Sequence, residues 1–170
     1  MHRKYLNFIT QSVIVFAIII WIPLSGFAAG PKTVIFCIGD GMSSVQRTIA
    51  EEVHGQKLAM NTLPIVGIYT TYALNSLVTD SAAAATALAT GHKTDALVLS
   101  LDPEGEVAYE TLAEAAKRLG KSVGLVTTTR ITHATPASFG SHVDTRYREN
   151  EIAEQYLDQD FEVLLGGGWR

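Results

Sequence analysis

Short apolar runs with β-strand character alternate with helical segments along this chain, and this alternation constrains the fold more than any other feature of the sequence. Four runs are predicted strands: residues 34–38, 65–72, 122–128 and 161–165. Four further segments are predicted helices: residues 45–53, 81–88, 111–119 and 149–157. Strands that alternate with helices are joined by right-handed crossovers within one sheet. The sequence therefore predicts an α/β fold with a mostly parallel central sheet and helices on both faces.

The first predicted strand, residues 34–38, is apolar throughout and ends at Gly39-Asp40-Gly41. A run without polar residues is expected to have both faces buried, as a central parallel strand does. Cys37 lies within it and is predicted to be a small buried apolar group. No disulfide can form within the chain, because Cys37 is the only cysteine.

The N-terminus has the three parts of a secretory signal peptide. A basic head (His2-Arg3-Lys4) precedes an apolar stretch at residues 13–24, and small residues follow at Gly26 and Ala28. We expect cleavage after residue 28 and export to the periplasm or the cell exterior, with residues 29–170 as the mature domain. The alternative is an uncleaved membrane anchor, although the apolar stretch is shorter than the ~20 residues of a typical spanning helix.

The charge balance argues against one class of partner. The chain has 13 Lys and Arg against 17 Asp and Glu, a formal net charge of −4, and no basic stripe stands out. Nucleic acid is therefore not expected as a specific partner.

Asp40 is the first candidate site residue. It lies between two glycines at the end of a predicted strand, where chemistry gathers in parallel sheets. Gly39 and Gly41 permit close approach of the backbone, so the carboxylate could project into a cleft. The other interpretation is a turn aspartate that hydrogen-bonds its own backbone.

Ser81 is the second candidate, because it begins the Ala-rich helix. Unpaired N–H groups and the helix dipole make the first helical turn a site for phosphate. Asp80 or Ser81 could instead be a simple N-cap. No Gly-x-Ser-x-Gly motif surrounds Ser81, so an α/β-hydrolase is not indicated. A serine nucleophile would then need activation by a metal, and Asp40 is the nearest candidate ligand.

A third group follows the predicted strand at residues 122–128. His133 and Thr135 lie two residues apart and could face one ion, and oxygen-rich sites suit Mg²⁺. Arg146 has a planar fork that matches two phosphate oxygens. The alternatives are a surface loop, a helix cap at Thr135-Pro136 and a solvated arginine.

Taken together, these segments resemble the alkaline phosphatase family. Residues 36–42 resemble its first metal-binding segment, and residues 78–87 with 90–94 resemble its nucleophile signature. Residues 127–137 and 142–146 are similar to its magnesium and phosphate-arginine region, and residues 164–168 to a later strand end. The similarity runs from about residue 33 to the last residue, in the family's order.

The resemblance implies two Zn²⁺ ions, one Mg²⁺ ion and a phosphate-monoester substrate. Asp40 would bridge one zinc and the magnesium, and Ser81 would be the zinc-activated nucleophile that forms a phosphoserine intermediate. Asp80 would orient Arg146, which would bind phosphate oxygens. Thr135 would be a magnesium ligand, and His133 would act on magnesium through water. The family also implies a homodimer for the full-length enzyme.

The remaining metal ligands of the family come from later parts of a longer chain. The 24 residues after Arg146 (170 − 146) contain no histidine. We therefore expect residues 29–170 to be the N-terminal part of the catalytic domain, roughly a third of a full-length member, with a fold incomplete at the C-terminus and no activity of its own. The alternatives are an inactive remnant that binds phosphate or metal at most, and a phosphodiesterase of the same superfamily.

Overall fold

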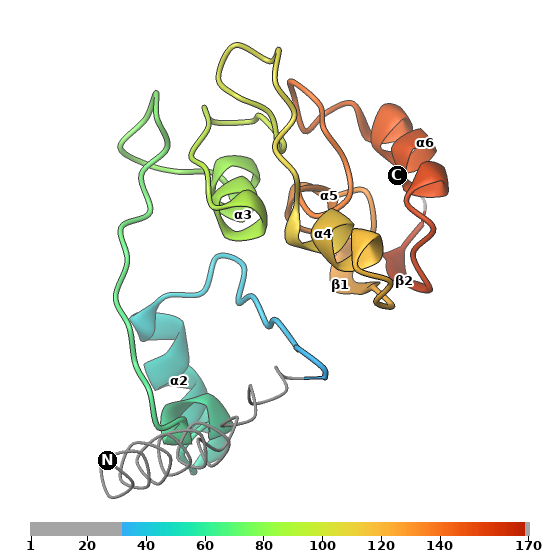
Figure 1. Ribbon diagram of the computed structural model, residues 1–170. Helices are drawn as coiled ribbons and strands as arrows, with labels where there is room; N and C mark the ends of the chain where they lie inside the picture. The colour runs from blue at the N-terminus through green and yellow to red at the C-terminus, as the bar shows by residue number, and fades with distance from the viewer. Residues whose placement is uncertain (1–31, 169–170) are drawn as a thin grey trace, which may run out of the picture. The chain divides into compact units, whose positions relative to one another are not determined.

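The computed structural model describes residues 32–168 (Figure 1). Its elements are α2 (Ser44–His54), a 3-10 turn η1 (Ala59–Thr62), α3 (Ser81–Thr90), α4 (Leu112–Arg118), β1 (Gly124–Arg130), α5 (Ala134–Ala137), α6 (Glu149–Asp158) and β2 (Val163–Gly167). The signal peptide predicted at residues 1–28 lies outside the described part of the chain. No helix within residues 32–168 is long and apolar enough to cross a membrane.

Two of the four predicted strands are not formed. Residues 34–38 and 65–72 have no strand pairing, and their apolar side chains are exposed, including Ile35 at 83% and Ile68 at 100%. Cys37 is likewise exposed, so its predicted burial is wrong. A strand needs a partner for its backbone N–H and C=O groups. Neither run finds one among the described residues, so a strong apolar pattern alone does not produce a strand.

The four predicted helices are confirmed, and their ends have clear local causes. Ser43 caps α2 and forms a capping box with Gln46. Asp80 caps α3 by accepting a hydrogen bond from the N–H of Ala83 at 3.1 Å. α3 ends at Gly91, whose φ of +77° favours glycine because other residues meet a steric cost there. Such caps satisfy N–H groups that have no partner within the helix.

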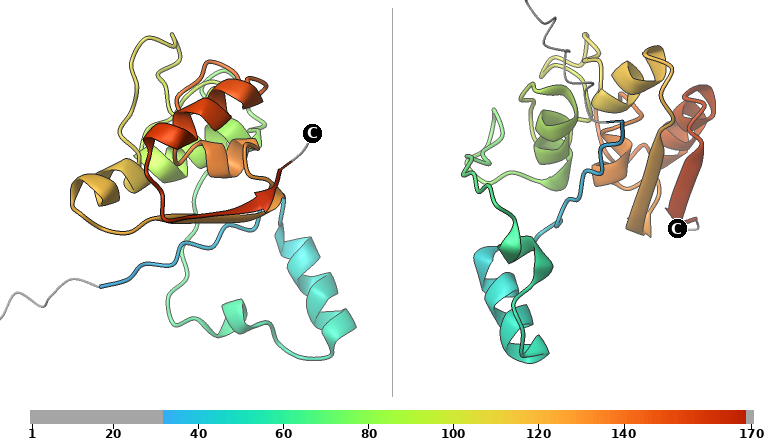
Figure 2. Two further views of the ribbon diagram at one scale, coloured as in Figure 1. Left: turned by 90° about the vertical axis from the view of Figure 1, so that its right-hand side faces the viewer. Right: turned by 60° about the horizontal axis from the view of Figure 1, so that its bottom comes forward.

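The strands predicted at residues 122–128 and 161–165 are confirmed as β1 and β2, which pair in parallel. The register matches Gly124 with Val163 and Arg130 with Gly167, with an irregularity between Val126 and Arg130. Figure 2 shows α5 and α6 on the same side of this pair. The opposite side carries exposed apolar residues, Val126 at 73% and its register partner Leu165 at 58%.

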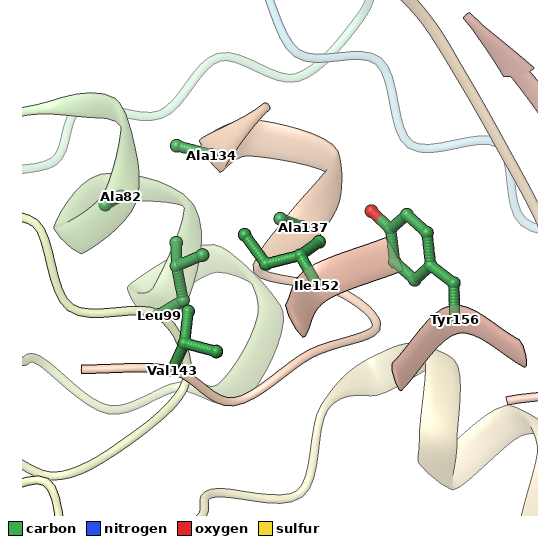
Figure 3. Packing of buried hydrophobic residues seen from close by; sticks show 7 residues of the cluster. All are labelled: Ala82, Leu99, Ala134, Ala137, Val143, Ile152 and Tyr156. Atoms are coloured by element: carbon green, nitrogen blue, oxygen red, sulfur yellow. The ribbon is translucent and has the colours of Figure 1, made fainter. Parts of the chain in front are cut away.

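A small apolar core joins α3, α5 and α6 (Figure 3). Its buried members are Ala82, Leu99, Ala134, Ala137, Val143, Ile152 and Tyr156. Alanines occupy the facing positions of α3 and α5, so the two short helices can approach closely. The phenol of Tyr156 donates a 2.9 Å hydrogen bond to the carbonyl of Ile131, which ties α6 to the end of β1. This core fixes α3 and α5, the two helices that carry Ser81 and Thr135.

Candidate functional site

The carboxylate of Asp40 lies between two hydroxyl groups from distant parts of the chain. Ser81 Oγ donates to Asp40 Oδ1 at 3.0 Å, and Thr135 Oγ1 donates to Asp40 Oδ2 at 2.6 Å. Ser81 is the first residue of α3, and Thr135 lies in α5. Three predicted site residues are therefore brought together, and the carboxylate of Asp40 bonds other segments of the chain.

The N-terminal end of α3 presents Ser81 beside a charged cap. Asp80 Oδ1 accepts hydrogen bonds from the backbone of Ala83 and Leu97, at 3.1 and 3.2 Å. Partial burial opposes ionisation of Asp80, but these bonds and one from Arg146 outweigh it and lower its pKa. Asp80 is thus the N-cap of α3 and also a carboxylate that accepts hydrogen bonds from Leu97 and Arg146.

Arg146 contacts two other predicted residues through its guanidinium. Nη1 donates to Asp80 Oδ2 at 3.0 Å, and Nη2 lies 3.0 Å from His133 Nε2. The Arg146 side chain is only 15% exposed. These bonds use two of the five N–H donors of a guanidinium, and the others could bind phosphate oxygens.

His133 is the N-cap of α5, and its tautomer follows from its neighbour. A guanidinium can only donate, so His133 Nε2 accepts and the ring proton lies on Nδ1. Burial, followed by the charges of Arg146 and Arg130, lowers the pKa of His133. Its Nδ1 is buried without a protein partner in the described part of the chain. That atom is a donor that a water molecule could satisfy.

The donor set fits part of a magnesium site. Asp40 supplies a carboxylate and Thr135 a hydroxyl, which are hard oxygen donors of the kind Mg²⁺ prefers. Ser81 Oγ adds another oxygen donor. Within residues 32–168, no three His, Cys, Asp or Glu side chains are grouped to hold a metal ion.

Leu97 is a site residue that the sequence analysis missed. Its N–H donates to Asp80 Oδ1 at 3.2 Å, and its carbonyl accepts from the N–H of Arg146 at 2.8 Å. Its φ is +76°, which is unfavourable for a leucine. Because Leu97 makes these contacts with its backbone N–H and carbonyl, its residue type gives no sign of them in the sequence.

Glu149 is a second missed residue, at the start of α6. It forms a two-pronged ion pair with Arg130, at 2.8 and 2.7 Å, and accepts from Thr132 Oγ1 at 2.7 Å. Its side chain is 11% exposed. Glu149 therefore fixes the segment between β1 and His133.

Comparison with known proteins places the whole segment in one family. The family model described as "Alkaline phosphatase" matches residues 31–170. Alkaline phosphatase 3 of Bacillus subtilis is 44% identical over 151 residues, which cover 81% of this chain and 32% of that protein. The chain thus spans about a third of the length of the curated relatives it matches.

Solved structures give the same relationship in three dimensions. Alkaline phosphatase from the Antarctic bacterium TAB5 superposes with a TM-score of 0.74 at 32% identity, covering 78% of this chain and 38% of that one. A histidine-to-aspartate variant of that enzyme, with Mg bound in its M3 site, has a TM-score of 0.65 at 28% identity, covering 71% of this chain and 35% of that one. Because the family match takes in most of the chain, this protein belongs to the alkaline phosphatase family.

Proposed function

We propose that this chain is part of a phosphate-monoester hydrolase in which Ser81 takes up the phosphoryl group. The observation that carries the proposal is the position of Ser81, at the first turn of α3 with Asp40 bonded to its hydroxyl. Dipole and N–H groups at a helix start favour a phosphate there. Arg146, bonded to the neighbouring Asp80, supplies positive charge for the phosphate oxygens.

In the proposed reaction, Ser81 Oγ attacks phosphorus and the bond from phosphorus to the leaving alcohol breaks. The Ser81 proton passes to solvent as the alkoxide forms, and the leaving oxygen acquires a proton from solvent. Water then attacks the phosphoserine, which releases inorganic phosphate and restores the hydroxyl. Arg146 would bind two phosphate oxygens throughout, while Asp80 keeps its guanidinium in place.

Zinc and magnesium, when bound, would lower the pKa of the Ser81 hydroxyl and stabilise the attacking and leaving oxygens. In this chain Asp40, Ser81 and Thr135 would be direct ligands, and His133 would act through water. The hydrogen bonds from Ser81 and Thr135 to Asp40 support this set of ligands, because they hold the three oxygen-bearing side chains together. Two zinc ions and one magnesium ion are proposed for the complete protein.

The proposal can be tested in a chimera, because the chain matches about a third of its relatives. Residues 31–170 would replace the matching segment of the Bacillus subtilis enzyme. With Zn²⁺ and Mg²⁺ we expect hydrolysis of a chromogenic phosphate monoester. Ser81→Ala should lower kcat/KM by at least about 1000-fold, as loss of a nucleophile does. Ser44→Ala is the matched control, since Ser44 is likewise the first residue of a helix, α2.

Several outcomes would decide among the alternatives. An inactive chimera with normal folding would favour a remnant that only binds phosphate or metal. Faster turnover of a phosphate diester than of the monoester would favour a phosphodiesterase. Activity of the 170-residue chain alone, above its Ser81→Ala variant, would overturn the expectation that the segment is inactive in isolation.

We further propose that residues 1–28 are a cleaved signal peptide and that residues 29–170 are the N-terminal part of a catalytic domain that dimerises.

For the complete domain we propose a larger parallel sheet with helices on both faces. The exposed side chains of Val126 and Leu165 support this, because they form an apolar surface of the kind that a helix covers. The mass of the exported protein would test the cleavage site, and sedimentation of the complete protein would test dimerisation.

A further inference from the structure

His142 lies between α5 and α6, and both nitrogens of its ring face hydrogen-bond acceptors. Nδ1 is 2.8 Å from the carbonyl oxygen of Ser100, and Nε2 is 2.8 Å from Glu114 Oε1. The side chains of His142 and Glu114 are 19% and 21% exposed. A backbone carbonyl cannot donate, so the proton between Nδ1 and Ser100 belongs to the ring.

Glu114 does not supply the second proton. Its Oε2 accepts from the N–H of Thr111 at 2.8 Å, and its Oε1 also accepts from Gln159 at 3.1 Å. Burial opposes ionisation, but the bonds from His142 and Thr111 outweigh it and lower the pKa of Glu114 to about 2. Because both oxygens of the Glu114 carboxylate already accept hydrogen bonds, the proton of the 2.8 Å bond at Nε2 is assigned to the ring. With Nδ1 also donating, the ring carries a positive charge.

The groups around the ring are consistent with that charge. Burial would lower the pKa of His142, but the bonds to Glu114 and to the Ser100 carbonyl outweigh it and raise the pKa. On the α4 side, Lys117 bonds Glu162 at 2.8 Å. From α6, the uncharged amide of Gln155 bonds the backbone N–H and C=O of His142 at 2.7 and 3.0 Å.

The segment that begins at His142 leads to Arg146. Val143 exchanges two backbone hydrogen bonds with Leu99, at 2.9 and 3.1 Å, and the N–H of Arg146 donates to the carbonyl of Leu97 at 2.8 Å. Residues 142–146 therefore lie along residues 97–100. The bonded ring of His142 holds one end of this pairing, and Arg146 stands at the other.

We propose that His142 is a positioning residue, held as an imidazolium between Glu114 and the Ser100 carbonyl, and that it fixes the segment that carries Arg146. The effect on phosphate rests on the proposed function above, whereas the charge of His142 does not.

A histidine with a raised pKa stabilises the fold below its unfolded value of about 6.5 and loses this effect as pH rises through the folded pKa. Glu114 stabilises above about 4.5 and loses its effect as pH falls towards 2. The pair is strongest between these limits.

The charge is tested by proton–nitrogen NMR of the histidine rings in the 170-residue chain. We expect both nitrogens of His142 to carry protons at pH 6, and Glu114→Gln to lower the proton affinity of the ring about tenfold or more. Glu110→Gln is the matched control, because Glu110 lies just before α4 but pairs with the exposed Arg118. A His142 ring with one protonated nitrogen at pH 6, or a proton affinity unchanged by Glu114→Gln, would overturn the proposed charge.

The positioning role is tested in the active chimera. We expect His142→Gln to raise KM and the inhibition constant of inorganic phosphate about tenfold, with a smaller change in kcat. Glu114→Gln keeps the shape of its side chain and should give the same pattern if His142→Gln folds poorly. An unchanged phosphate constant in both variants would refute positioning. A chimera that is inactive with His142 and Ser81 intact would refute the proposed function, while the NMR result would still decide the charge.

Discussion

Arg146 and Asp80 are joined by a 3.0 Å bond between Nη1 and Oδ2, across 66 residues of sequence. The same carboxylate group caps α3 through its other oxygen. The helix start that presents Ser81 and the guanidinium that would bind phosphate are therefore held by one side chain. A substitution of Asp80 is therefore expected to affect both the start of α3 and the position of the Arg146 guanidinium.

Arg146→Lys tests the value of the guanidinium fork. A lysine keeps the charge but cannot bond Asp80 and His133 while also offering a planar pair of donors to phosphate. We expect KM for a phosphate monoester in the chimera to rise about tenfold to hundredfold, corresponding to about 1.5–3 kcal/mol for bonds to charged groups. Arg148→Lys is the control, because Arg148 forms exposed pairs with Asp144 and Glu151. Equal effects of the two substitutions would contradict the role of Arg146.

Asp80→Asn tests the acid dependence of stability. The folded pKa of Asp80 is lower than its ordinary value of 3.8, so its stabilising effect is present above that pH and is lost as pH falls through the folded pKa. Asparagine caps helices well but carries no charge. We expect the urea midpoint of the variant to fall less than that of the parent between pH 5 and pH 3.

Asp158→Asn, at the exposed end of α6, is the comparison for this acid profile. It should keep the pH dependence of the parent chain. Asp80→Ala should cost about 1 kcal/mol more than Asp80→Asn at pH 7, because it also removes the helix cap. Identical unfolding curves for the two Asp80 variants would mean that the cap contributes nothing measurable.

Leu97 tests backbone strain next to the site. Its φ of +76° suits glycine, so Leu97→Gly should change the free energy of unfolding by less than about 1 kcal/mol despite the lost side chain. Leu97→Ile should destabilise by about 1–2 kcal/mol, because a β-branched residue adopts this conformation poorly. Urea unfolding distinguishes the two. A more stable isoleucine variant would show that the segment relaxes out of the left-handed region.

Gly166→Ala tests the closeness of β1 and β2. A methyl group there would lie 2.7 Å from Thr127 Cγ2 and 3.1 Å from the carbonyl oxygen of Thr129. We expect a loss of about 1–3 kcal/mol in unfolding free energy, as in other overpacked positions. Gly168→Ala is the matched control, because a methyl group there meets nothing within 4 Å. Equal stability of the two variants would show that the strands move apart at little cost.

Local signals predicted the helices well. Ser43, Asp80 and Thr111 are caps that the sequence itself supplies, and α2, α3 and α4 begin directly after them. The runs at residues 34–38 and 65–72 were wrongly predicted as strands, because pairing depends on partners that a local pattern does not contain. β1 and β2 form because each strand is the hydrogen-bonding partner of the other.

The candidate site shows a similar division. Motif residues such as Asp40, Ser81 and Thr135 were predicted, and the structure brings their side chains together. Leu97 was missed because its contribution is made by backbone atoms in an unusual conformation. Glu149 was assigned only to a helix, although it also binds Arg130 and Thr132.

The long separation between Asp40 and Thr135, 95 residues, has a consequence for biosynthesis. At a ribosomal rate of about 5–20 residues per second, Thr135 follows Asp40 out of the ribosome by roughly 5–20 s. α2 can form during that delay, but Asp40 cannot form its hydrogen bonds until Ser81 and Thr135 have been synthesised. Apolar segments such as residues 65–69 are meanwhile accessible to chaperones and to other nascent chains. Assembly of the site is thus a late, non-local event, and substitutions that slow it would lower the yield of native protein even where its final stability is unchanged.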